Sequence, residues 1–65
     1  MMTFEELARM LAKRDGMSFE DELIAINFAA DEIETAFYNG DLALAEDILK
    51  TSLSLEPDYL DIFIN

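Results

Sequence analysis

The chain contains no cysteine and no histidine, and it has a single proline and two glycines. Without cysteine there are no disulfide bonds, and without either residue the usual ligands of a structural zinc site are missing. The same two side chains supply many of the nucleophiles and general bases that work near neutral pH. We therefore expect no enzyme activity and no cofactor, because carboxylates, hydroxyls, phenols and amines are the reactive groups that remain.

Carboxylates are the remaining candidate ligands for a hard cation such as calcium. They gather at residues 20–22 and 31–34, which read EDE and DEIE. Neighbouring residues of a helix point about 100° apart, so these side chains do not converge on one ion. We therefore expect no metal site, and interpret both clusters as solvated helix faces and helix-start charges.

Basic residues are scarce, with four against fifteen acidic residues and a formal net charge of −11. The imbalance lies beyond residue 14, because residues 15–65 hold thirteen acidic residues against Lys50 alone. Such a segment is repelled by nucleic acid phosphates and by anionic lipid headgroups. We expect no direct contact with nucleic acid or membrane. The favoured partner is a protein that is basic or that itself binds nucleic acid.

Long hydrophobic runs are also absent, since no apolar stretch reaches the roughly 18 residues of a membrane-spanning helix. Glu5 and Glu6 stand where a signal peptide carries positive charge, so a cytoplasmic location is expected. Hydrophobic residues still make up 52% of the chain, too many for a disordered acidic tail. Residues 1–65 are expected to form one helical domain. Its small core favours stabilisation by self-association or by a partner.

Local signals predict an all-α fold, a small bundle of three to four helices over about 4–14, 19–38, 42–54 and, briefly, 57–63. Thr3 and Glu6 have the spacing of a capping box at the start of the first helix. Gly16 suits the end of that helix, because glycine adopts the left-handed conformation easily. Asp41 suits the first turn of the third helix and Pro57 that of the fourth.

The second helix carries one apolar stripe with helical spacing, formed by Phe19, Leu23, Ile26, Ala30, Ile33 and Phe37. We expect this stripe to be its buried face. The apolar residues of the third helix cover about half of the helical wheel, so this helix is expected to pack against two neighbours.

The turn at Gly40 and Asp41 is followed by small, large, small and proline positions at Ala45, Leu49, Ser52 and Pro57. This spacing resembles the second half of a tetratricopeptide unit, here about residues 26–59. The resemblance implies a helix-turn-helix and a protein-binding role. The alternative is a generic helical bundle with a similar turn. A lone unit does not form the concave groove of a repeat array, so binding is expected through outer faces.

Two apolar segments are candidate interfaces. Phe28 lies opposite the stripe of the second helix, with Ile24 one turn before it. Either the first helix or the C-terminal segment covers them, or they form a second contact face. The C-terminal segment either packs back onto the core or forms a hydrophobic hook between chains. The predicted interface comprises Ile24, Phe28, Asp31, Tyr59, Leu60, Phe63 and Ile64.

The function that these features favour is a small acidic protein–protein interaction module that self-associates, for example as a homodimer. The alternative is an inhibitor that imitates nucleic acid with its carboxylates and blocks a nucleic-acid-binding protein, as small phage-type inhibitors do. Mimicry requires acidic residues in line on one face, whereas those of the second helix point in several directions. Arg9, Lys13 and Arg14 either complement the dipole at the end of the first helix or pair with another subunit.

Overall fold

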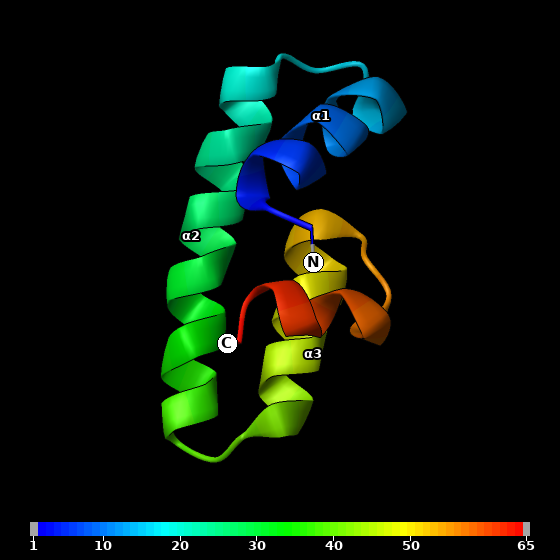
Figure 1. Ribbon diagram of the computed structural model, residues 1–65. Coiled ribbons are helices and arrows are strands. Elements are labelled where there is room, and N and C mark those ends of the chain that lie inside the picture. The colour runs from blue at the N-terminus through cyan, green and yellow to red at the C-terminus, as the bar shows by residue number, and fades with distance from the viewer. Residues whose placement is uncertain (1, 65) are drawn as a thin grey trace.

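A computed structural model describes residues 2–64, and Figure 1 shows its arrangement. The fold is all-α, as predicted. Its elements are three α-helices and a short 3₁₀ helix: α1 (Phe4–Asp15), α2 (Phe19–Tyr38), α3 (Leu42–Leu53) and η1 (Pro57–Ile62). The predicted bounds agree with these to within one residue, because each helix end carries a local stop or start signal.

Capping residues begin and end the helices where the sequence places them. The Thr3 hydroxyl accepts a hydrogen bond from the Glu6 amide at 3.1 Å, and the Glu6 carboxylate accepts one from the Thr3 amide at 2.9 Å. The bond from the Thr3 amide to the ionised carboxylate lowers the pKa of Glu6. Gly16 ends α1 with φ +68°, and the Asp41 carboxylate accepts from the Leu44 amide at 3.0 Å to begin α3.

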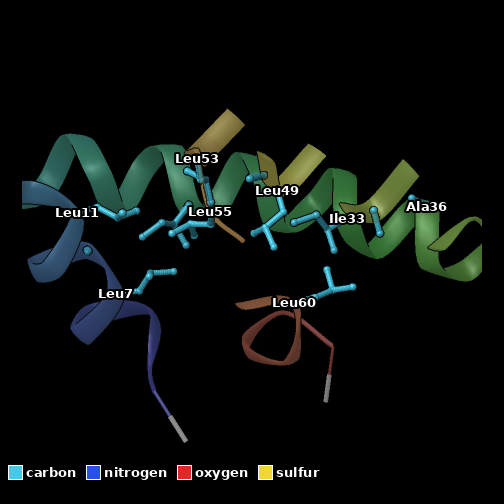
Figure 2. Packing of buried hydrophobic residues seen from close by; sticks show 12 residues of the cluster. Leu7, Leu11, Ile33, Ala36, Leu49, Leu53, Leu55 and Leu60 are labelled. Atoms are coloured by element: carbon cyan, nitrogen blue, oxygen red, sulfur yellow. The ribbon is translucent and has the colours of Figure 1, made fainter. Parts of the chain in front are cut away.

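The helices form two layers around one core (Figure 1). One layer is the antiparallel hairpin of α2 and α3, and the other consists of α1 and η1, which both pack on the same face of that hairpin. Between the layers lie Leu7, Leu11, Ile33 and Leu49 (Figure 2), which together with Ile26 are the largest fully buried side chains. The opposite face of the hairpin has no covering helix in the described part of the chain.

The buried face of α2 differs from the predicted stripe. Ile26 and Ile33 are buried as expected, but Ala29 and Ala36 are buried as well, while Phe37 is 46% exposed. The cause is that α2 packs against both α3 and α1. These contacts bury the side of α2 that carries the two alanines. The small alanine side chains let neighbouring helices approach α2 closely. The prediction that α3 has two neighbours is confirmed, since it packs on α2 and η1.

The C-terminal segment folds back and closes the core. Leu60 is only 5% exposed, and the Phe63 ring lies with its centroid 5.3 Å from that of Phe4. The half-buried Tyr59 hydroxyl donates to the Met10 sulfur at 3.9 Å. The first of the two interpretations of this segment is therefore confirmed, because it packs back onto the core. Leu60, which the sequence placed in the predicted interface, has its side chain buried within the monomer.

Candidate partner-binding surface

The outer face of α2 carries two exposed apolar side chains. Phe28 is 69% exposed and Ile24 is 55% exposed, while the exposed Asp31 follows one turn after Phe28. Neither α1 nor the C-terminal segment covers them, so the interpretation in which these segments bury Phe28 was wrong. The spacing of these residues places them on the side of α2 that faces away from Ile26 and Ile33.

Exposed carboxylates surround this apolar pair on α2: Glu20, Asp21, Asp31 and Glu32. Within residues 2–64 the ion pair present is that of Arg14 with Asp15, with 2.7 Å between Nε and Oδ1. The carboxylates around Phe28 therefore have no basic side chain of the chain as a counter-ion. The face combines an aromatic centre with a negative rim.

A groove lies between α2 and α3, with a volume of about 410 Å³. Its lining comes from these two helices and the residue that ends α2: Asp31, Glu32, Thr35, Ala36, Asn39, Leu44 and Ile48. Leu44 is 45% exposed, and Ile48 is half-buried. The sequence predicted that apolar residues cover about half of the α3 wheel, but it did not identify Leu44 and Ile48 as surface. The available signal was the width of the apolar arc on the α3 wheel. This arc extends to a side of α3 that no described helix covers.

A second, larger depression of about 560 Å³ holds the end of the predicted interface. Phe63 and Ile64 line it together with Glu34, Phe37 and Tyr38 of α2. This places them apart from Ile24 and Phe28, which line neither depression. The predicted site residues thus fall into three places: the outer face of α2, this depression and, for Tyr59 and Leu60, the core and its edge.

A polar cluster ties the end of α1 to the end of α3. Arg14 donates from Nη2 to the carbonyl of Leu53 at 2.8 Å and from Nη1 to that of Ser54 at 3.1 Å. Ser54 ends α3 in the left-handed conformation with φ +54°, although it is not a glycine. The guanidinium satisfies carbonyls that a helix C-terminus leaves without partners. The interpretation of Arg14 as a simple complement to the α1 dipole missed this bridge.

Glu22 lies beside this cluster and is 4% exposed, so its assignment to a solvated face was wrong. Its Oε2 atom has no hydrogen-bond partner within the described residues. Burial, and then a hydrogen bond with Asp15, raise the pKa of Glu22. The hydrogen bond from Arg14 lowers the pKa of Asp15. As pH falls, Glu22 is therefore expected to take up a proton before Asp15 does.

We predict that Glu22→Gln stabilises the fold at pH 7 by about 1 kcal/mol, because the amide is neutral and can still donate to Asp15. A raised pKa in the folded state means that Glu22 stabilises while protonated and that this contribution is lost as pH rises through its folded pKa. The advantage of the variant over the wild type should therefore vanish in acid. Urea unfolding at pH 7 and in acid measures the difference in the free energy of unfolding, with Glu20→Gln as the exposed control. An equal difference at both pH values contradicts the prediction.

Comparison with known proteins finds no matching family model, no similar curated protein and no similar solved structure. Among residues 2–64 no three carboxylates gather in a way that could hold a metal ion. The helices of that same part of the chain are all too short or too polar to cross a membrane. The surface chemistry is therefore the basis for the functional proposal.

Proposed function

We propose that this chain is a protein–protein interaction module that binds a basic protein through the outer face of α2. The observation that carries the proposal is Phe28, an aromatic side chain 69% exposed at the centre of a carboxylate-rich face. An exposed aromatic side chain within a polar rim is typical of a binding hot spot. The resemblance of residues 26–59 to a tetratricopeptide unit supports the same role, since such units bind proteins.

The two components of this face contribute differently. Removing the Phe28 side chain from water stabilises a complex by up to about 1.5–3 kcal/mol. The carboxylates contribute mostly to the rate of association and to the choice of partner, since rim charges steer encounter and are screened by salt. A basic partner supplies the counter-ions that the chain lacks around Phe28.

Self-association through this face is disfavoured by charge. A second copy would bring Asp31 and its neighbours against the same carboxylates, at a net charge of −11 per chain. Of the four basic residues, Arg14 is already engaged by Asp15 and by the carbonyls at the end of α3. A heterologous complex is therefore the arrangement that we propose. Sedimentation of the isolated chain at micromolar concentration should show a monomer.

The test compares two phenylalanines on opposite sides of one helix. Phe28 and Phe37 are nine residues apart, which places them about 180° apart on α2. We expect Phe28→Ala to weaken the complex with a protein captured from cells of the source organism by at least about tenfold. Phe37→Ala should leave the affinity unchanged. Calorimetry with the purified chain and partner measures both affinities. The Phe28→Ala variant should keep the wild-type stability to within about 0.5 kcal/mol.

Two results contradict this proposal. If both alanine variants bind as the wild type does and affinity collapses at moderate salt, then the carboxylates alone make the contact. That pattern supports the nucleic-acid-mimic alternative, in which Phe28 has no part. If both variants lose affinity equally, then the outer face of α2 is not the specific contact.

A further inference from the structure

The groove between α2 and α3 lies on the face of the hairpin that no described helix covers. Its lining residues come from α2, the residue that ends α2, and α3, whereas α1 and η1 pack on the other face (Figure 1). Phe28 is one turn before Asp31 and Glu32, which line the groove, so its exposed ring stands beyond the groove's end. Apolar and acidic surface therefore continues from Phe28 along the hairpin.

We propose that this groove binds an amphipathic, basic α-helix of the partner; the proposal rests on the function proposed above and names the element that docks. Ala36, Leu44 and Ile48 supply apolar lining, and Ala36 is small enough for close approach. The furrow between two antiparallel helices is a natural place for a third helix to pack. The docked helix forms the missing layer on this face.

The backbone of the hairpin favours a helix over an extended peptide. An extended peptide needs hydrogen bonds from its receptor, usually from a sheet edge, and no strand is present among residues 2–64. The backbone groups along α2 and α3 are used within the helices, and the Thr35 hydroxyl already donates to the Asp31 carbonyl at 3.0 Å. The occupant must therefore satisfy its own backbone, as a helix does.

Length and charge define the docked helix further. From Phe28 to Asn39 the chain of α2 rises by about 16 Å, which matches about three turns of a partner helix. Three turns present apolar residues at i, i+3 or i+4, and i+7. Asp31 and Glu32 lie along the α2 side of the groove and favour lysine or arginine on the flanks of that stripe.

A second copy of the chain does not supply such a helix. Three of its four basic residues, Arg9, Lys13 and Arg14, lie on α1, which carries as many acidic residues and so has no net positive charge. The apolar side of α1 is already used, because Leu7 and Leu11 are fully buried in the core of the same chain. A partner of different sequence is therefore required.

The experiment uses two synthetic 18-residue peptides of leucine and lysine with the same composition. One has leucines at helical amphipathic spacing, and the other is scrambled so that no apolar stripe forms. Calorimetry at about 0.15 M salt, where exposed charges are partly screened, measures binding to the wild-type chain. We expect the patterned peptide to bind at least about tenfold more tightly than the scrambled one.

Two leucines of α3 make a matched pair of variants. Leu44 is 45% exposed and lines the groove, whereas Leu42 is 50% exposed and does not line it. They lie about 200° apart on the helix. Leu44→Ser should weaken the patterned peptide by about five- to tenfold, and Leu42→Ser should leave its affinity unchanged. Circular dichroism verifies that both variants remain folded.

Four results overturn the groove proposal: no binding of the patterned peptide, equal binding of the scrambled peptide, equal losses from both serine variants, or no loss from Leu44→Ser. In each case the effect of Phe28→Ala on the captured partner decides the broader proposal separately. A loss there keeps α2 as the interface and removes only the groove and its helix. No loss there, together with a harmless Leu44→Ser, removes both.

Discussion

Replacing Leu60 with alanine is expected to lower the free energy of unfolding by about 2–4 kcal/mol, the usual cost of a large-to-small change in a core. Leu60 is 5% exposed and joins η1 to the core cluster shown in Figure 2. A chain of this length has a total stability of about 3–10 kcal/mol. The loss is therefore a large share of the whole, and the midpoint of thermal unfolding should fall by roughly 10–20 °C.

The control for Leu60→Ala is Leu42→Ala, because Leu42 is 50% exposed and its truncation should change stability by about 0.5 kcal/mol or less. Thermal unfolding followed by circular dichroism measures both variants. The comparison also separates two roles for the C-terminal segment. If Leu60→Ala keeps the wild-type unfolding midpoint and instead loses the partner, then Leu60 belongs to an interface and the segment does not close the core.

Arg14→Ala is expected to destabilise the fold by about 1–2 kcal/mol. The estimate takes the lower part of the range for hydrogen bonds to charged groups, because the Arg14 side chain is 38% exposed. The variant loses both bonds to the carbonyls of Leu53 and Ser54, which join segments about forty residues apart in the chain. It also leaves Asp15 and Glu22 adjacent without a cation.

Lys13→Ala distinguishes this bridge from a helix-dipole effect. Lys13 and Arg14 are both basic residues in the last turn of α1, so a dipole contribution should be similar for the two, at a few tenths of a kcal/mol. Urea unfolding should show a clearly larger loss for Arg14→Ala. Glu22→Gln introduced together with Arg14→Ala should restore part of the stability, because it removes one of two adjacent carboxyl groups. Equal losses from Lys13→Ala and Arg14→Ala contradict the bridge.

The same contacts that hold the fold also shape the proposed binding surface. Ala29, Ala36 and Ala45 are buried, and Ala36 also lines the groove between α2 and α3, so its size affects the depth of that groove. The Arg14 bridge holds the far end of α3 to α1. We infer that variants that remove these contacts weaken binding indirectly. The binding experiments, including the Leu42 and Phe37 controls, therefore require a check that each variant is folded.

Helix positions in this chain follow from residues close together in sequence. The bond between Thr3 and Glu6 spans three positions, as does that between Asp41 and Leu44, and Gly16 acts on the turn that precedes it. Such signals need no knowledge of the tertiary fold. The all-α class and the helix bounds could therefore be predicted from the chain alone. The same holds for the excess of acidic residues, on which the proposal of a basic partner rests.

Which faces are buried was decided only when the helices packed. The periodicity of α2 is compatible with several buried sides, and the positions of α1 and α3 select the one that buries Ala36 and leaves Phe28 in water. The burial of Glu22 and of Leu60, and the Arg14 bridge, likewise depend on elements far away in sequence. Periodicity reports how apolar a face is, whereas exposure depends on which other element reaches that face.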